Sequence, residues 1–314
     1  MVQKDCIDMY DSIIILGATA TGKTDISIRL AKKLNTEIIN ADSMYIYKNL
    51  NIGTAKPTEE EMAGVTHHLI SIVDECDTFN VSEYRQLAKE KISEFREKGL
   101  MPIIVGGTGF YIDSLIKDYS YGETGSNMQL REQLQGELNK YGKEYIFDKL
   151  KSLDTISAEK LHPNDTVRVI RAIEIALSSG TNKSGIINLE KPLLSKPLII
   201  GLNMDRELLY PKINQRVDIM LKDGLLDEVK SLYNRGFTPE NNQCMKGIGY
   251  KEITEYLDGN YDLDTAIEKI KQHTRNYAKR QITWFKRNQD IIWFDPSTTS
   301  KDEIIDKILK LLNN

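Results

Sequence analysis

The hydrophobic positions along the chain alternate between short apolar runs and longer amphipathic stretches. The run at residues 13–16 contains only isoleucine and leucine, which predicts a strand covered on both faces. Ile26, Leu30 and Leu34 follow at helical spacing, and a further helix is expected over residues 82–98. More strands are predicted at residues 37–40, 68–73, 102–105, 198–202 and 291–294. Strands that alternate with helices predict an α/β fold with a parallel sheet covered by helices.

The pattern changes near Asp118. Residues 119–125 have the composition of a loop, and residues 126–180 are charged, amphipathic and almost free of predicted strands. Residues 181–197 contain one glycine and two prolines, which is typical of a linker. We therefore expect an all-helical domain at residues 122–195, inserted into an α/β core made of residues 1–121 and 196–314.

The composition, with 40% hydrophobic and 28% charged residues, is that of a globular protein and excludes a disordered chain. No apolar run approaches the roughly 18 residues of a membrane span, and no signal peptide is visible. Cys6, Cys76 and Cys244 lack the spacing of metal ligands, so we interpret them as reduced thiols of a cytoplasmic protein. The net charge of −4 excludes a uniformly basic nucleic-acid binder but allows a local basic face.

A glycine-rich sequence at residues 17–24, GATATGKT, matches the phosphate-loop pattern G-x-x-x-x-G-K-[ST]. It lies after the first predicted strand and before the first predicted helix, as this motif requires. The glycines let backbone N–H groups point inward, and the helix N-terminus adds a partial positive charge. Lys23 supplies a charge for phosphoryl oxygens, and the Thr24 hydroxyl is a ligand for Mg²⁺. The motif predicts a P-loop NTPase-like sheet that binds a ligand with a diphosphate group.

The motif alone does not identify that ligand, which is usually ATP or GTP. The chain lacks an N-K-x-D guanine motif, and no apolar strand ends in a clear Walker B aspartate. The acidic residue best placed for chemistry is Asp42, which follows the second predicted strand. Ligands of open α/β sheets bind at that edge. A nucleoside or small-molecule kinase is therefore one alternative.

Residues 269–287 form a basic segment without Asp or Glu, in a chain of net negative charge. Arg275, Lys279 and Lys286 fall near one helical face, where they would meet phosphates along a line. Three aromatic residues are interleaved with the basic ones. The segment is either a solvated basic helix whose aromatic residues belong to the core, or an RNA-binding helix.

Several longer motifs accompany the phosphate loop. They are DS at residues 42–43, NIGTAKP at 51–57, HHL at 67–69, PIIVGGTGFY at 102–111, HPNDTVRVIRAIE at 162–174, GIGYKE at 247–252 and TRNYAKRQITWF at 274–285. With these motifs the chain resembles, over nearly its whole length, the bacterial tRNA dimethylallyltransferases, also called tRNA isopentenyltransferases. The resemblance implies transfer of a dimethylallyl group from dimethylallyl diphosphate to the N6 amine of the adenosine 3′-adjacent to the anticodon of a tRNA.

The resemblance also implies which residues form the site. Asp42 would be the general base, with Thr108 near the diphosphate and the reacting amine. The diphosphate would be held by Mg²⁺ on Thr24 and by Gly17, Ala18, Thr19, Ala20, Thr21, Gly22, Lys23, Thr24 and Arg216. The implied tRNA contacts are Asp42, Ser43, Met44, Tyr45, Thr108, Arg131, Val167, Arg168, Arg171, Lys246, Gly249, Lys251, Lys279, Arg280 and Gln281. We expect the stacked target adenosine to be extruded to reach Asp42.

Two positions depart from the family pattern. Tyr45 stands where the family usually has glutamine, and its effect on how the base is held stays open. Val167 stands where glutamine often precedes the first arginine of the insertion motif. The chain also lacks the Cys/His spacing of the zinc finger of eukaryotic relatives, so we expect no zinc.

Three functions fit parts of the sequence. A tRNA prenyltransferase uses the phosphate loop for its leaving group, a kinase uses it for ATP, and an RNA-binding scaffold would carry it without activity. The basic segment and the insertion favour prenyl transfer, because a kinase of small metabolites needs neither. We expect a cytoplasmic monomer that binds the anticodon stem-loop of tRNA and does not bind membranes.

Overall fold

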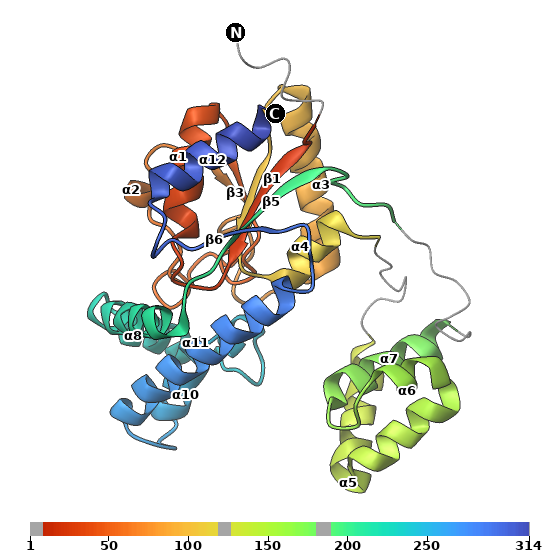
Figure 1. Cartoon of the computed structure of the whole chain (residues 1–314). Coiled ribbons are helices and arrows are strands. Elements are labelled where there is room, and N and C mark those ends of the chain that lie inside the picture. Colours follow the sequence, from red (N-terminus) through yellow and green to blue (C-terminus); the bar gives the residue numbers. More distant parts are fainter. Residues whose placement is uncertain (1–8, 119–126, 180–189, 314) are drawn as a thin grey trace. The chain divides into compact units, whose positions relative to one another are not determined.

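The computed structural model describes residues 9–118, 127–179 and 190–313 (Figure 1). The chain divides into two compact units, one of Met1–Lys117 with Pro192–Asn314 and one of Asp118–Lys191. Both boundaries lie slightly earlier in the chain than the predicted insertion of residues 122–195. The predicted loop at residues 119–125, most of the linker at residues 181–197 and Cys6 fall outside the described residues.

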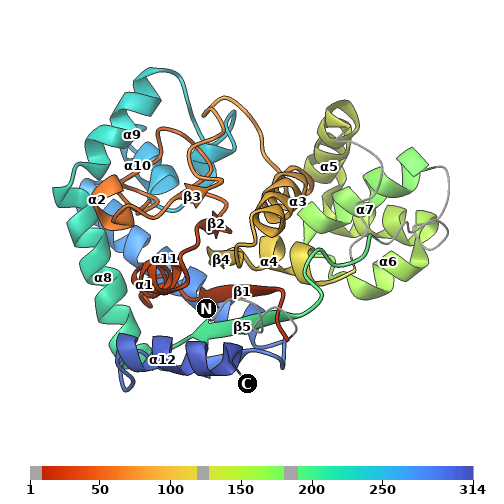
Figure 2. The ribbon, with the colours of Figure 1, turned by 90° about the horizontal axis from the view of Figure 1, so that it is seen from above.

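The first unit is built on a six-stranded parallel sheet with the strand order β3-β2-β4-β1-β5-β6. The strands are β1 (Ser12–Gly17), β2 (Ile38–Asn40), β3 (His67–His68), β4 (Ile103–Gly106), β5 (Pro197–Leu202) and β6 (Ile292–Phe294). Helices cover both faces of this sheet (Figure 2). The predicted α/β class with a P-loop-like parallel sheet is confirmed.

Strand β1 is apolar along its length because both of its faces are buried. Ile13 and Ile15 belong to a core with residues of α1 (Lys23–Leu34) and α12 (Lys301–Leu312). Ile14 and Leu16 belong to a second core, to which α3 (Val81–Glu97) and α4 (Gly109–Ile116) contribute. Successive strand residues point to opposite faces, so a sheet between two helix layers needs apolar residues at every position.

The predicted strand at residues 68–73 is wrong in its extent, because β3 contains His67 and His68 alone. Leu69 and Ser71 have φ angles of 60° and 54°, in the left-handed region, and a strand does not continue through such residues. The Asn40 side-chain amide donates to the carbonyl of Leu69 at 3.0 Å. The backbone turn therefore gains a hydrogen bond from β2 in place of strand pairing.

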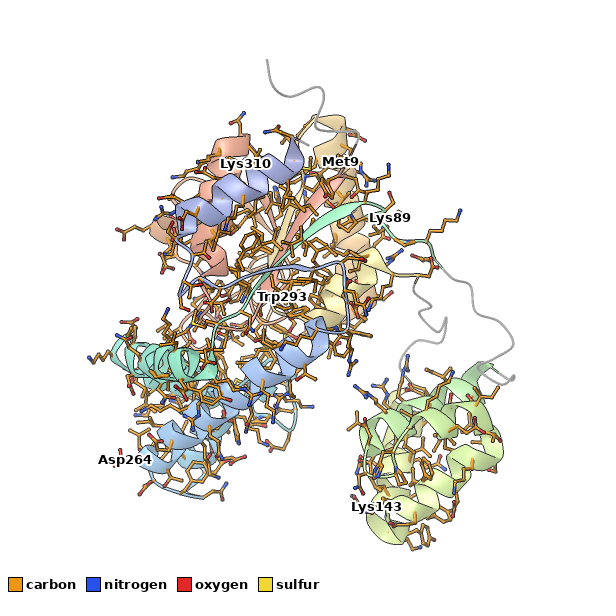
Figure 3. All side chains as sticks on the ribbon, viewed as in Figure 1. Met9, Lys89, Lys143, Asp264, Trp293 and Lys310 are labelled. Atoms are coloured by element: carbon orange, nitrogen blue, oxygen red, sulfur yellow. The ribbon has the colours of Figure 1, made fainter. Side chains whose placement is uncertain are left out.

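The C-terminal part of the first unit is helical. Its helices are α8 (Arg206–Lys222), α9 (Leu225–Asn234), α10 (Tyr250–Leu257) and α11 (Leu263–Phe285), with a short helical turn at η1 (Cys244–Lys246). A further short helix, α2 (Glu59–Met62), lies earlier in the chain, between β2 and β3. Helix α11 packs against α8, α10, α4 and β1. Trp293 of β6, labelled in Figure 3, is partly buried and packs against the core that includes Phe285 of α11. Within the described ranges, no helix has both the length and the apolar character to cross a membrane.

The described residues of the second unit form the helices α5 (Met128–Leu153), α6 (Thr155–Lys160) and α7 (Thr166–Ser179). Its own core includes Leu134, Ile146, Leu150 and Ile173, all fully buried. Helix α5 bends at Gly142, which has a φ angle of 86° that glycine adopts readily.

Candidate active site

Three neighbouring strands, β2, β4 and β1, end at the same edge of the sheet. In their register Asn40 lies opposite Val105, and Leu16 lies opposite Gly106. The segments that leave these strands carry Asp42, the glycine-rich turn at residues 106–109 and the phosphate loop. The carboxyl ends of parallel strands meet at one edge, so the topology brings the predicted catalytic and diphosphate-binding residues together.

The phosphate loop joins β1 to α1 as its sequence predicts. Gly17 and Gly22 have φ angles of 148° and 87°, and a side chain on Gly17 would overlap the carbonyl of Leu202. The Thr21 hydroxyl donates to the carbonyl of Ala18 at 2.8 Å, which closes the loop on itself. The loop ends where α1 begins at Lys23, so the N-terminal amides of this helix lie at the site.

Lys23 folds back over the loop, and its ammonium group donates to the carbonyls of Gly17 and Ala18 at 3.1 and 2.7 Å. Burial lowers the pKa of Lys23 to about 8, against the attraction of Asp42 and together with the repulsion of Arg216. These two partners are neutral carbonyls, and a bound diphosphate would give the ammonium group a negatively charged partner.

Asp42 follows β2 and is held by its own neighbours. Its backbone N–H donates to Asn40 Oδ1 at 2.9 Å, and the Met44 N–H donates to Asp42 Oδ1 at 3.0 Å. Burial raises the pKa of Asp42 above its usual value, and the Met44 hydrogen bond, Lys23 and Arg216 oppose this rise only in part. A carboxylate with a raised pKa accepts a proton more readily, which suits a general base.

Thr108 connects the glycine-rich turn to the segment that carries Asp42. Its Oγ1 accepts from the Ser43 N–H at 2.9 Å and donates to Ser43 Oγ at 3.2 Å. Its backbone N–H donates to the carbonyl of Ala41 at 3.1 Å. Tyr277 of α11 also lies beside Thr108, and burial raises the pKa of Tyr277 well above its usual value. In the sequence Tyr277 is one of three aromatic residues in the basic segment, and no pattern there indicates that it lies beside Thr108.

Arg216 of α8 spans the phosphate loop and the NIGTAKP segment. It lies 3.5 Å from Thr19 Oγ1 and donates to the carbonyl of Ala55 at 3.3 Å. The Tyr45 hydroxyl donates to the same carbonyl at 2.8 Å. Ala55 has a φ angle of 54°, which turns this carbonyl away from regular structure. Burial raises the pKa of Tyr45 to about 12, so its hydroxyl stays neutral and donates.

Glu228 of α9 holds the NIGTAKP segment, and no pattern in the sequence indicated this role. Its carboxylate accepts the backbone N–H groups of Asn51, Ile52 and Gly53 at 2.8–3.0 Å. It also accepts the Tyr250 hydroxyl at 2.6 Å. A side chain on Gly53 would collide with the Tyr250 ring, which explains the glycine in this motif. The segment that presents the Ala55 carbonyl is therefore fixed by a carboxylate from another element.

The basic helix α11 divides its charged residues between protein partners and solvent. Lys271 pairs with Asp218 of α8 at 2.9 Å, and Arg275 donates to Asn214 Oδ1 at 2.7 Å. Lys279 and Arg280 are exposed. The predicted tRNA contacts Lys246 and Lys251 are exposed as well, Gly249 is buried, and Gln281 is only 5% exposed.

The predicted contacts of the helical unit lie on α5 and α7. Arg131 and Arg171 pair with the buried Glu174 at 2.8 and 2.6 Å. Arg168 pairs with Asp165 at 3.2 Å near the surface, and Val167 is 78% exposed.

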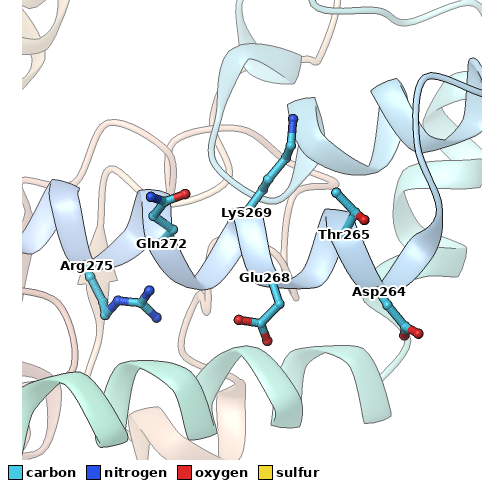
Figure 4. A pocket seen from close by; sticks show the side chains of 6 residues that line it. All are labelled: Asp264, Thr265, Glu268, Lys269, Gln272 and Arg275. Carbon is cyan, nitrogen blue, oxygen red and sulfur yellow. The ribbon is translucent and has the colours of Figure 1, made fainter.

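A separate hollow of about 500 Å³ lies on the N-terminal half of α11 (Figure 4). It is lined by Asp264, Thr265, Glu268, Lys269, Gln272 and Arg275. Of these, Arg275 belongs to the helical face that the sequence predicted to meet phosphates. Across the described parts of the chain, no three His, Cys, Asp or Glu side chains gather as a metal-binding group.

Comparison with known proteins gives consistent matches over most of the chain. The family model for IPP transferase matches residues 45–288. The tRNA dimethylallyltransferase of Bacillus subtilis (strain 168) is 48% identical over 284 residues, which is 90% of each chain. That of Alkaliphilus metalliredigens is 46% identical over 299 residues, covering 95% of this chain and 96% of the relative.

Solved structures agree with these matches. The crystal structure of a tRNA isopentenylpyrophosphate transferase from Bacillus halodurans is 41% identical, with a TM-score of 0.72 and coverage of 96% of this chain and 97% of the other. A eukaryotic dimethylallyltransferase acting on tRNA is 30% identical, with a TM-score of 0.80 and coverage of 96% and 79%. The chain belongs to the IPP transferase family.

Proposed function

We propose that this protein transfers the dimethylallyl group of dimethylallyl diphosphate to the N6 amine of the adenosine 3′-adjacent to the anticodon of a tRNA. The observation that carries the proposal is that Asp42, Thr108, Arg216 and the phosphate loop share one sheet edge. A base, a hydroxyl and an anion cradle are the groups that this reaction needs. The tRNA dimethylallyltransferases among its relatives support the same activity.

In the proposed reaction the adenosine N6 forms a bond to C1 of the dimethylallyl group while the C1–O bond to diphosphate breaks. The electron pair of the C1–O bond leaves with diphosphate, and the N6 proton passes to Asp42. An adenine amine is a weak nucleophile because its lone pair is delocalised into the ring. A positioned general base typically accelerates such a step by about 10²–10⁴-fold, and the raised pKa of Asp42 suits that role.

The leaving diphosphate is bound by the loop amides, by Lys23 and by Arg216. Lys23 exchanges its contacts with the Gly17 and Ala18 carbonyls for phosphoryl oxygens, which favours its charged form. A few protein oxygens together with substrate phosphates are the usual environment of Mg²⁺, so the Thr24 hydroxyl at the start of α1 fits this ion. Bound Mg²⁺ would supply positive charge to the diphosphate oxygens.

The tRNA is bound through phosphate contacts and through the extruded target base. Lys279 and Arg280 are exposed on α11, the helix that also carries Tyr277 beside Thr108. Phosphates bound there would lie near the site, and an adenosine must leave its stack to reach Asp42. Arg131, Arg168 and Arg171 of the helical unit are further proposed contacts.

The proposal is tested by incubating an anticodon stem-loop with the protein, Mg²⁺ and dimethylallyl diphosphate, in the absence of ATP. We expect the RNA mass to rise by one five-carbon group on a single adenosine. Unmodified RNA, together with ATP consumption and a phosphorylated product in a parallel reaction, would instead indicate a kinase. RNA binding without either reaction would indicate a scaffold.

A further inference from the structure

Gln281 of α11 joins the two loops of the site. Its Oε1 accepts the backbone N–H of Thr19 at 2.9 Å, and its Nε2 donates to the carbonyl of Gly107 at 2.9 Å. A backbone N–H is always a donor and a carbonyl always an acceptor, so the bridging side chain must offer one of each. Among side chains of this length only an amide does so, because glutamate has no donor when ionised and lysine has no acceptor.

The surrounding packing leaves Gln281 no freedom to turn outward. Its side chain is 5% exposed, and Tyr277, one turn earlier on α11, lies beside it and beside Thr108. Ala278 packs against Ala18 of the phosphate loop, so the helix approaches the loop closely at this point. A Cβ at Gly107 would lie far inside contact distance of Gln281 Nε2, so the bridge itself excludes a side chain at that position.

The neighbouring residues Lys279 and Arg280 are exposed and available to phosphates. The family resemblance implies that Gln281 contacts the tRNA. In the structure its side chain is buried, and its amide is bonded to Thr19 of the phosphate loop and to Gly107. We propose that Gln281 is a positioning residue, which fixes the Thr19 amide beside the diphosphate and the Gly107–Thr108 peptide beside Asp42. This inference rests on the proposed function, and it makes α11 the element that carries RNA contacts on one side and aligns the site on the other.

The test compares Gln281→Met, which keeps the volume and removes both hydrogen bonds, with Gln272→Met, an exposed position on the same helix. Two neutral hydrogen bonds correspond to about a tenfold effect or more. We expect Gln281→Met to raise the KM for dimethylallyl diphosphate about tenfold and to lower kcat, with an unchanged Kd for tRNA. Gln272→Met should match the unsubstituted protein in all three quantities.

Calorimetric titration with inorganic diphosphate gives a readout that needs no prenyl transfer. Weaker diphosphate binding by Gln281→Met supports the inference even if the protein proves to catalyse another reaction. Failure of the proposed function would be visible separately, as unmodified RNA with the unsubstituted protein. A weakened tRNA Kd with normal diphosphate binding would overturn the inference and make Gln281 an RNA contact.

A double-substitution cycle guards against an effect of general destabilisation. Gly107→Ala should weaken diphosphate binding because its methyl group displaces the Gln281 amide. Gln281→Ala removes that amide, so adding Gly107→Ala to it should have little further effect. Additive losses, or a lowered melting temperature with normal diphosphate binding and normal kinetics of the folded fraction, would reduce Gln281 to a core residue and refute the proposal.

Discussion

Arg131 donates from Nε to the fully buried carboxylate of Glu174 at 2.8 Å, across two helices of the helical unit. Arg171 and the Asn127 N–H bind the same carboxylate. Burial acts to raise the pKa of Glu174, but Arg171, Asn127 and Arg131 outweigh it and lower the pKa overall. A single buried acid therefore orders two of the three arginines of the helical unit that we propose as tRNA contacts.

Glu174→Gln should destabilise the helical unit and weaken tRNA binding. The neutral amide keeps one acceptor but loses the charge that two guanidinium groups share. Hydrogen bonds to a charged group contribute about 1.5–3 kcal/mol, and the partial exposure of both arginines places the loss at the lower end. Thermal unfolding and tRNA titration measure the two effects, with exposed Glu132→Gln as the control. Unchanged tRNA affinity in a destabilised protein would show that Arg131 and Arg171 do not contact the tRNA.

Asp42→Asn should lower kcat by about 10²–10⁴-fold, because the amide cannot take the N6 proton. The Met44 N–H still finds an acceptor in the asparagine carbonyl, so the local backbone should keep its conformation. Single-turnover prenylation measures the chemical step, and filter binding measures tRNA affinity, which should stay near that of the unsubstituted protein. A normal single-turnover rate would exclude Asp42 as the base.

The value of kcat/KM for dimethylallyl diphosphate should decrease at both acid and alkaline pH. On the acid side, protonation of Asp42 removes the base, and its raised pKa places this loss above the usual range of an aspartate. On the alkaline side, Lys23 loses its charge near its pKa of about 8. Lys23→Arg keeps a charge there, so its alkaline limb should move to higher pH. An identical alkaline limb in both proteins would assign it to another group.

The fold and the predicted diphosphate cradle follow from local patterns in the sequence. Apolar runs such as residues 13–16 predict strands, and the G-x-x-x-x-G-K-[ST] spacing sets the loop between β1 and α1. The predicted extent of the third strand was wrong, because periodicity does not reveal that Leu69 and Ser71 adopt left-handed backbone conformations. Local patterning carries information about a segment's own conformation and little about its distant partners.

The positioning residues illustrate that limit. Glu228 binds backbone amides 175–177 positions earlier in the chain, and Gln281 binds a carbonyl 174 positions earlier. Backbone atoms are the same at every residue, so no side-chain spacing marks these contacts. In the sequence Glu228 looks like any acidic residue of a helix, and Gln281 looks like any polar residue of a basic helix.

Arg280→Gln should reduce the salt dependence of tRNA binding. Arg280 is exposed, and each phosphate contact contributes about 0.7–0.9 to the slope of log K against log salt concentration. We expect the slope to fall by about this amount, with a normal kcat at saturating tRNA. Exposed Lys310→Gln on α12 removes an equal charge elsewhere and should leave the slope unchanged. Equal slopes for all three proteins would mean that this face of α11 does not meet phosphate.

Glu228→Gln should weaken donor binding through Ala55 and Arg216. The substituted amide places its own N–H groups against those of residues 51–53, so the segment should move. The Ala55 carbonyl then no longer accepts the hydrogen bond from Arg216. Loss of a charge-assisted contact of this kind corresponds to about a tenfold rise in the KM for dimethylallyl diphosphate. Steady-state kinetics measure this rise, and Asp227→Asn, at an exposed position beside it, is the matched control.

The route of this effect is decided by combining Glu228→Gln with Arg216→Gln. If Glu228 acts through Arg216, the second substitution should add little to the first, because the diphosphate contact is already lost. Fully additive increases in KM would show instead that Glu228 stabilises the segment without influence on Arg216. The Tyr250 hydroxyl, which shares the carboxylate at 2.6 Å, offers a third position: Tyr250→Phe should reproduce a weaker form of the Glu228→Gln defect.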